Sequence, residues 1–292
     1  MLKLLGRIKP DVVFSKGSFV AVPVGIAANI RRIPIITHDS DTTPGLANRL
    51  IGRRAKVHAT GMPVEFYDYP RESTVFSGIP ISDDIKKVDS AIQDDFKKDL
   101  GIPISSQVVT VVGGGNGALT INNLLLSIAP KLLDNYKNLH ILHISGQAHE
   151  SSVAKSYDSA LNPETLPRVK VIGFTDEVHK YTGAADLVIS RAGATFIAEL
   201  AIQAKASIII PSPFLAGGHQ LKNAEQLKKQ DAAVVLANDI SADKFYEVVN
   251  KLLQDKKRRQ ELAANITSFA KPGATKTLAE IILSAAASGT GN

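Results

Sequence analysis

The sequence predicts an α/β protein with two Rossmann-like domains, each built on a parallel sheet. Two observations predict it. Short apolar or β-branched runs alternate with amphipathic helical patterns along almost the whole chain, which is typical of parallel βαβ units. The runs are apolar at consecutive positions, as strands buried on both faces are. With 292 residues, 44% of them hydrophobic, the chain is long enough to bury two cores of medium size.

The apolar runs predict ten strands, and four longer segments carry apolar residues at helical spacing. The polar, acidic stretch from Ser82 to Ser90 separates two αβ series, so we expect domains at 1–83 and 84–292. The expected strands are 11–15, 34–38, 56–60, 75–77, 107–112, 140–145, 170–172, 187–190, 207–210 and 233–236, and the clearest expected helices are 117–133, 194–203, 219–229 and 242–253.

Composition limits the function and the compartment. The chain has no cysteine, which excludes disulfides, a thiolate zinc site and a cysteine nucleophile, and fits the cytoplasm. Its most apolar stretch, 19–30, is interrupted by Pro23 and Gly25 and is shorter than the roughly 20 residues of a membrane span. The net charge of +6 comes with only 5% aromatic residues, so nucleic acid is not an expected partner. We expect a cytoplasmic protein whose membrane contact is peripheral.

The strongest local motif is a glycine-rich turn between a predicted strand and a predicted helix. Its residues are Gly113, Gly114, Gly115, Asn116 and Gly117. Glycines let the backbone approach a ligand closely, and the free N–H groups of a helix start attract phosphate oxygens. The run matches neither the Walker pattern nor a complete dinucleotide fingerprint. Taken alone it fits a tight structural turn equally well, although a diphosphate is a natural ligand.

Two further strand-to-helix junctions carry polar residues. Thr195 and Glu199 lie one helical turn apart near the start of a predicted helix, where a carboxylate can accept hydrogen bonds from ribose hydroxyls. Gln220 and Asn223 lie three apart on another predicted helix start, and their amides can both donate to and accept from sugar hydroxyls. Because ligands of open parallel sheets bind at the carboxyl ends of the strands, we expect the three clusters to form one site.

These motifs together resemble MurG-type transferases, which add N-acetylglucosamine to the lipid-linked muramoyl-peptide, lipid I, of peptidoglycan synthesis. The resemblance covers nearly the whole chain in the expected order, and it implies a GT-B-type fold and an inverting hexosyltransferase that needs no metal or other cofactor. The segments that carry it are the glycine turn at 113–118, 191–199, 211–224, and 38–49 with its His38-Asp39-Ser40-Asp41 and Pro44-Gly45 to Asn48-Arg49.

The resemblance also implies roles for single residues. Phe174 and Thr175 would lie against uracil and Glu199 would bind the ribose. Gly115, Asn116 and Ala194 would flank the diphosphate or the sugar, and Gln220 and Asn223 would bind the sugar hydroxyls. Further substrate-binding candidates are Gly114, Gly117, Arg191, Gly193, Thr195 and His219. His219 replaces a second glutamine of the family, and Ser82 replaces an arginine near the phosphates, so recognition of the donor is expected to differ there.

On the acceptor side, His38, Asp39 and Asn48 are the candidates, His38 and Asp39 being weak candidates for catalysis. The family's Glu-Gln-Asn after the histidine is Asp39-Ser40-Asp41 here. This Asp-x-Asp imitates the metal motif of another glycosyltransferase fold, but its surroundings match the GT-B pattern. For His38, a structural role in which it makes hydrogen bonds within the protein is as good an interpretation as a direct contact with the acceptor.

The family's first strand and glycine loop, which carry its favoured catalytic base, have no counterpart before Met1. The first domain is therefore expected to be incomplete, and no base is assigned. Either the chain is truncated or a partner chain completes the domain. Two alternative functions stay open: a donor-binding subunit of a split transferase, and an enzyme similar to UDP-N-acetylglucosamine epimerases.

A small amphipathic face is the candidate for membrane contact. Leu46, Leu50 and Ile51 recur at helical spacing beside Arg49, Arg53 and Arg54, and this combination suits anionic headgroups on the inner face of the cell membrane. An ordinary helix that packs its leucines inward is the alternative.

Overall fold

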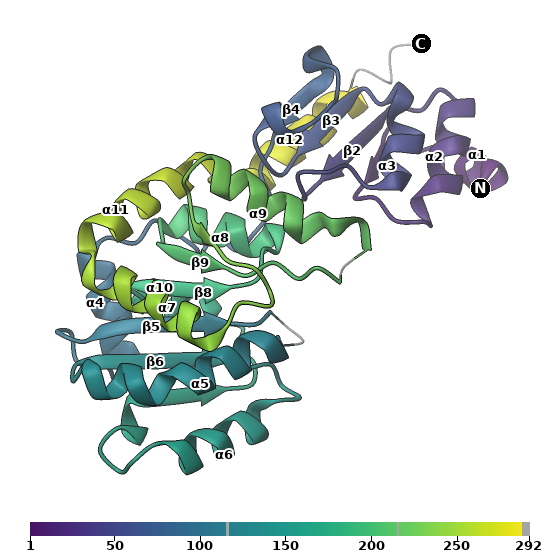
Figure 1. Ribbon diagram of the computed structural model, residues 1–292. Coiled ribbons are helices and arrows are strands. Elements are labelled where there is room, and N and C mark those ends of the chain that lie inside the picture. The colour runs from purple at the N-terminus through teal and green to yellow at the C-terminus, as the bar shows by residue number, and fades with distance from the viewer. Residues whose placement is uncertain (115–116, 215, 288–292) are drawn as a thin grey trace. The chain divides into compact units, whose positions relative to one another are not determined.

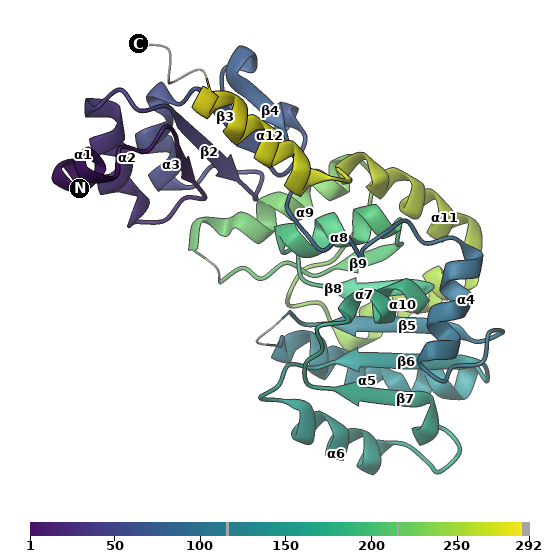
Figure 2. The same cartoon turned by 180° about the vertical axis from the view of Figure 1, so that it is seen from behind.

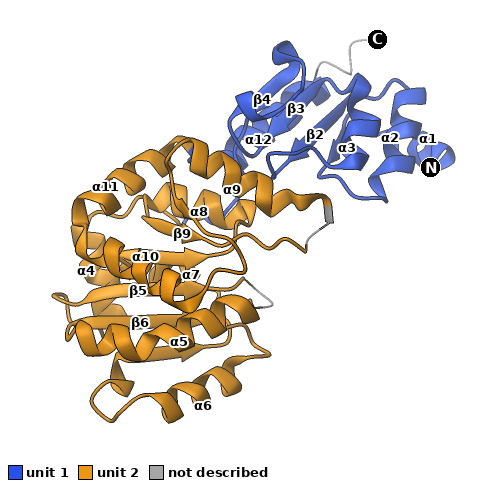
Figure 3. Cartoon of the chain, viewed as in Figure 1, with its two compact units in different colours: residues 1–83, 269–292 blue, residues 84–268 orange. Residues whose placement is uncertain are grey.

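The computed structural model describes residues 1–114, 117–214 and 216–287. Their contacts divide the chain into two compact units, shown in Figure 3: unit 1 contains 1–83 and 269–292, and unit 2 contains 84–268. The sequence-based division at Asp83 and Asp84 recurs here, but the segment from 269 onward differs from the prediction. Its described residues, 269–287, pack with unit 1 and not with the second domain, to which the prediction of 84–292 assigns them.

Unit 1 has a four-stranded parallel sheet in the order β1-β2-β3-β4. Its small core contains Leu5, Ala27, Ala28 and Ile35. The C-terminal segment packs with this unit, and Phe269, which precedes the C-terminal helix, contacts Phe66 with ring centroids 5.7 Å apart. The elements are β1 (Val13–Ser15), β2 (Ile35–Asp39), β3 (Val57–Thr60), β4 (Thr74–Phe76), α1 (Leu2–Ile8), α2 (Ala21–Ile30), α3 (Leu46–Ile51) and α12 (Ala274–Ala287).

Unit 2 has a six-stranded parallel sheet in the order β10-β9-β8-β5-β6-β7 (Figure 1). From the central strand β5, the chain adds β6 and β7 on one side, and then β8, β9 and β10 on the other. The strands are β5 (Gln107–Val112), β6 (Leu139–Ile144), β7 (Val169–Ile172), β8 (Leu187–Ser190), β9 (Ser207–Ile209) and β10 (Val234–Val235). The ten strands coincide with the ten predicted runs to within two residues at each end.

Helices cover both faces of this sheet (Figures 1 and 2). Alternate strand residues such as Val109 and Val111 pack against α5, α6, α10 and α11, while Val108 and Val112 pack against α4, α7 and α8. This burial on both faces explains why the strands are apolar at consecutive positions. The helices are α4 (Ser90–Asp99), α5 (Leu119–Asn135), α6 (Glu150–Ala160), α7 (Val178–Ala184), α8 (Ala194–Gln203), α9 (His219–Lys229), α10 (Ala242–Gln254) and α11 (Lys256–Asn265).

Candidate functional site

A pocket opens in unit 2 at the carboxyl ends of β5 and β8, where the strand order reverses. Val112 at the end of β5 pairs with Ser190 at the end of β8, and the chain leaves the two strands toward different helices. The diverging connections leave a crevice there, which is the usual ligand site of open parallel sheets. Two of the junctions that the sequence singled out, the glycine turn and the segment that begins at Arg191, therefore meet at one edge.

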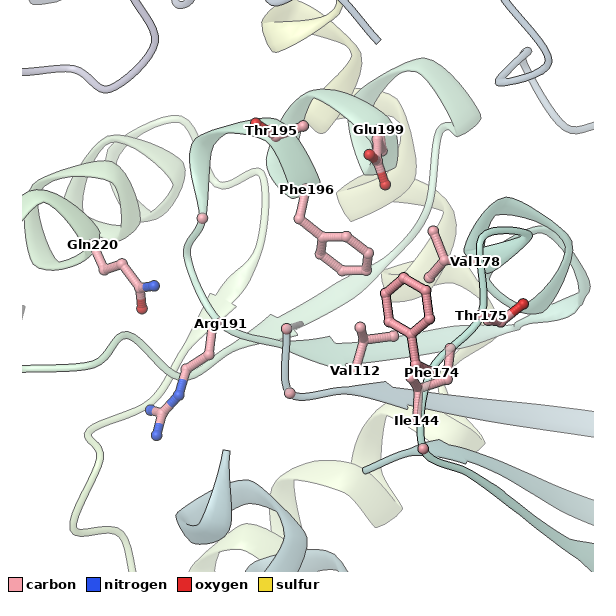
Figure 4. A pocket seen from close by; sticks show the side chains of 14 residues that line it. Val112, Ile144, Phe174, Thr175, Val178, Arg191, Thr195, Phe196, Glu199 and Gln220 are labelled. Carbon is pink, nitrogen blue, oxygen red and sulfur yellow. The ribbon is translucent and has the colours of Figure 1, made fainter. Parts of the chain in front are cut away.

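The pocket has a volume of about 310 Å³. Figure 4 shows Arg191 and Gln220 toward one end, Phe174, Val178 and Thr175 toward the other, and Glu199 on the side of Phe174 and Val178. Its lining consists of Val112, Gly113, Gly114, Ile144, Gly173, Phe174, Thr175, Val178, Arg191, Gly193, Thr195, Phe196, Glu199 and Gln220. All three predicted clusters contribute to it, so their expected convergence is observed.

Glu199 is the one carboxylate in this lining. It lies on α8 one turn after Thr195, because the helix starts directly after β8 and carries both residues past the crevice. Burial raises the pKa of the Glu199 carboxyl from 4.5 to about 7. A carboxylate that is partly desolvated, and that pairs with no cationic side chain among the described residues, gains most from a ligand that donates hydrogen bonds to it.

Arg191 brings a positive charge to the opposite end. Its guanidinium Nη1 donates to the carbonyl oxygen of Ile210 at 2.9 Å and to Asn238 Oδ1 at 2.7 Å, and burial lowers its pKa. Both acceptors are neutral, so these bonds fix the guanidinium without neutralising it. A half-buried arginine held in this way is suited to a phosphate.

An apolar wall completes the pocket and was not predicted as part of the site. It is formed by Val112, Ile144, Val178 and Phe196, with the exposed ring of Phe174 at its edge. In the sequence these residues are ordinary members of strands and helices, and only their position beside a glycine turn distinguishes them. Such a wall suits the flat, weakly polar face of a base.

Of the two amides predicted at the start of α9, Gln220 lies in the pocket and Asn223 lies in the interior. Gln220 lines the pocket, and its Oε1 accepts from Ser212 N at 2.8 Å, which directs the amide group. Asn223 is only 1% exposed, and its Nδ2 donates to the Ala192 carbonyl oxygen at 3.1 Å. In this structure Asn223 holds the backbone before α8, and its predicted contact with the sugar stays a prediction. His219 and the buried Ala194 also lie outside the lining.

The glycine turn borders the pocket through Gly113 and Gly114. Gly115 and Asn116, both predicted to contact the donor, lie outside the described residues. Gly117 does not line the pocket. Its φ of +75° and its packing allow no side chain, since a Cβ would lie 2.3 Å from the Ser145 carbonyl oxygen. Gly117 is thus needed for the conformation of the turn.

In unit 1, the predicted acceptor-side residues Asp39 and Asn48 are interior. Asp39 is 5% exposed and Asn48 is fully buried. Asp39 Oδ1 accepts from Gly45 N and Asn48 Nδ2, both at 3.0 Å, and Oδ2 accepts from Tyr69 OH at 2.9 Å. With both its oxygens accepting hydrogen bonds, Asp39 orders the loop after β2 together with Asn48. The predicted catalytic role of Asp39 and the predicted substrate contact of Asn48 stay predictions.

His38 is fully buried and both its ring nitrogens are occupied. Nε2 lies 2.9 Å from the Gly78 carbonyl oxygen, which can only accept, so Nε2 carries the proton. Nδ1 then accepts from Lys16 Nζ at 2.7 Å, and burial lowers the histidine pKa, which keeps the ring neutral. His38 is therefore an interior residue with a structural role in this unit, and its predicted role in catalysis stays a prediction. The exposed end of the network is Lys16, which the sequence analysis missed although it directly follows a predicted strand.

Two family models match the chain. The glycosyltransferase family 28 N-terminal domain matches residues 1–60, and the glycosyltransferase family 28 C-terminal domain matches residues 108–278, more than half of the chain. The second match contains every residue of the pocket.

Curated relatives agree with these models. Proteins named UDP-N-acetylglucosamine–N-acetylmuramyl-(pentapeptide) pyrophosphoryl-undecaprenol N-acetylglucosamine transferase are 32% identical over 285 residues in Halothermothrix orenii and 30% identical over 286 residues in Moorella thermoacetica. The matches cover 96% and 97% of this chain and 76% of each relative.

Solved structures show the same GT-B-type fold. The crystal structure of Acinetobacter baumannii MurG matches 97% of this chain and 76% of its own, with a TM-score of 0.78 and 24% identity. The Neisseria meningitidis UDP-GlcNAc 2-epimerase bound to UDP-GlcNAc matches with a TM-score of 0.65 and 12% identity over 97% of this chain and 78% of its own, which shows a shared fold alone. By its sequence matches, the chain belongs to the MurG-type transferases of glycosyltransferase family 28.

Proposed function

We propose that this chain transfers N-acetylglucosamine from UDP-N-acetylglucosamine to lipid I, the lipid-linked muramyl-pentapeptide of peptidoglycan synthesis. An acceptor hydroxyl attacks the anomeric carbon in line with the departing UDP. A new C–O bond forms, the bond from that carbon to the phosphate oxygen breaks with its electron pair leaving on UDP, the proton of the acceptor hydroxyl is released, and the configuration inverts. The observation that carries the proposal is one pocket with a carboxylate at one end and an unneutralised guanidinium at the other.

The pocket residues suggest how the donor lies. Uracil would pack on the apolar wall beside Phe174, and Glu199 would accept from the ribose hydroxyls. The diphosphate would then reach Arg191 and the backbone at Gly113 and Gly114, and Gln220 would contact the sugar. Arg191 and the backbone donors would stabilise the departing diphosphate, so we propose that no metal ion is needed.

Two measurements test this function. Calorimetric titration with UDP should give saturable heat, unchanged by EDTA, and the absence of saturable heat would overturn the donor site. Incubation with UDP-N-acetylglucosamine and lipid I tests the reaction itself. Turnover by the isolated chain would refute the hypothesis that a partner chain is required, whereas UDP binding without turnover would favour the donor-binding subunit.

The Glu199→Ala variant should bind UDP more weakly by about 1–3 kcal/mol, or about five- to 150-fold in Kd, because the ribose hydroxyls lose a charged acceptor. Calorimetry at pH 8 measures the change. Glu225→Ala is the matched control, since Glu225 is an exposed carboxylate of the same unit that pairs with Lys229. Equal Kd values for the Glu199 variant and the wild type would remove Glu199 from the site.

UDP affinity should rise with pH and level off above about pH 7. Glu199 has a pKa of about 7 in the free protein, and ribose hydroxyls bind its carboxylate form, so binding below pH 7 expels a proton. The same raised pKa means that the folded protein binds more protons than the unfolded chain between pH 4.5 and 7. Without UDP, the free energy of unfolding should therefore fall as the pH rises from 4.5 to 7. Calorimetry in two buffers of different ionisation enthalpy measures the released proton. Glu199→Gln should abolish the part due to Glu199, while titration of the UDP phosphate remains.

We also propose peripheral contact with the inner face of the cell membrane through α3. Leu46 and Leu50 are 73% and 52% exposed, Arg49, Arg53 and Arg54 are exposed beside them, and only Ile51 packs inward. The alternative in which all three apolar residues pack inward therefore does not hold for the two leucines. In the described ranges, no helix is long and apolar enough to cross a bilayer.

Replacing Leu46 and Leu50 together by Ser should reduce binding to vesicles that contain anionic lipid by at least about tenfold, because burial of each leucine contributes roughly 1.5–3 kcal/mol. Sedimentation with vesicles measures it. Leu283→Ser is the control, since Leu283 of α12 is 67% exposed and lies away from the arginines in sequence. Equal loss in both variants would count against α3 as the contact.

A further inference from the structure

A buried chain of polar side chains lies beneath the glycine turn of unit 2. Tyr157 of α6, His143 of β6 and Asn122 of α5 are each at most 1% exposed. Tyr157 OH lies 3.1 Å from His143 Nδ1, His143 Nε2 lies 3.0 Å from Asn122 Oδ1, and Asn122 Nδ2 donates to the Ser145 carbonyl oxygen at 2.9 Å. None of the three side chains lines the pocket.

The direction of every bond in this chain is fixed by its last member. The Ser145 carbonyl can only accept, so the amide nitrogen of Asn122 faces it and Oδ1 faces His143. His143 must therefore donate from Nε2, and its Nδ1 accepts from the Tyr157 hydroxyl. This arrangement requires a neutral histidine, and burial lowers the pKa of His143 to about 4. Each polar group in the chain is satisfied, which makes the arrangement rigid.

The Ser145 carbonyl connects this chain to the site. It is the same oxygen against which Gly117 packs, since a Cβ on Gly117 would lie 2.3 Å from it. Ser145 follows Ile144, which lines the pocket, and Gly113 N donates to the Ile144 carbonyl oxygen at 3.3 Å. The backbone that holds the glycine turn in place is thus itself held by Asn122.

We propose that Tyr157, His143 and Asn122 are positioning residues that set the described glycines of the turn, Gly113, Gly114 and Gly117, for the donor diphosphate. This inference rests on the proposed function, because it assumes that the turn binds phosphate. Loss of a hydrogen bond among these three side chains frees the Ser145 carbonyl and lets the turn shift. Part of the binding free energy of the ligand is then needed to order the turn, so the affinity falls. Uridine has no phosphate and does not contact the turn, so its affinity should not depend on the hydrogen bonds of Tyr157, His143 and Asn122.

The test compares UDP with uridine in variants of the full chain. His143→Leu removes the donor to Asn122 and should raise the Kd of UDP about tenfold or more while leaving that of uridine within about threefold. His143→Gln keeps a donor and should restore most of the UDP affinity. Asn122→Leu, which can neither accept from His143 nor donate to Ser145, should reproduce the loss, and it decides the test if His143→Leu does not fold.

The control is an equally buried polar link in the same unit. Gln203 is 1% exposed, accepts from Thr182 Oγ1 at 2.6 Å and donates to the His179 carbonyl oxygen at 2.7 Å. Gln203→Leu should lower the melting temperature and leave both affinities unchanged. If the His143 and Asn122 variants lose stability but bind UDP as the wild type does, or lose UDP and uridine equally, the inference is overturned. If the wild type itself does not bind UDP, the proposed function fails first.

Discussion

Gly117→Ala should abolish measurable UDP binding, with a rise in Kd of more than about 100-fold. Gly117 has a φ of +75°, a region that costs other residues about 1–2 kcal/mol, and its new Cβ would lie 2.3 Å from the Ser145 carbonyl oxygen. The position of a Cβ is fixed by its own backbone and the Ser145 oxygen is a backbone atom, so neither can rotate away. The turn must move, and with it Gly113 and Gly114 of the pocket. Calorimetric titration with UDP measures the loss.

Gly101→Ala is the matched control for this variant. Gly101 has a φ of +73°, but a Cβ there would meet nothing within 4 Å, and the residue does not line the pocket. It carries the same backbone strain without the clash. We expect a loss of stability of about 1–2 kcal/mol and an unchanged Kd for UDP. Wild-type affinity in folded Gly117→Ala protein would show that the turn does not contribute to binding.

Asp39→Ala should destabilise unit 1 by about 3 kcal/mol or more without changing the affinity for UDP. The substitution leaves three donors, Gly45 N, Asn48 Nδ2 and Tyr69 OH, without their acceptor in a site that is almost fully buried. Each buried donor left unsatisfied costs about 1–3 kcal/mol. Hydrogen exchange of the β2 and β3 amides measures the change, and calorimetry with UDP monitors unit 2.

Asp39→Asn separates the hydrogen bonds from the charge. Its Oδ1 can still accept from Gly45 and Asn48, and only the bond from Tyr69 must reverse or break, so a smaller loss of about 1 kcal/mol is expected. If the alanine variant kept full stability but stopped turnover, Asp39 would act on the substrate. The interior role assigned to it here would then be wrong.

Within the proposed site, the parts that could be predicted are those set by local sequence. The apolar runs, the glycine turn and the starts of α8 and α9 each depend on neighbours along the chain, since strand burial, positive φ and helix starts have short-range signals. Once these elements form a parallel sheet, their junctions meet at its carboxyl edge. Glu199 and Gln220 could therefore be assigned to one pocket from the sequence.

The direction of each side chain was decided only by tertiary packing. Gln220 and Asn223 are three residues apart on α9, yet Gln220 lines the pocket and Asn223 bonds to the backbone before α8. His38 and Asp39 are likewise bound by residues distant in sequence, Gly78 and Tyr69. The segment 269–292 joins unit 1 for the same reason, through contacts such as that of Phe269 with Phe66. Sequence alone determined the family, the strands and the pocket's location, whereas contacts between distant residues determined which polar groups remain free for a ligand.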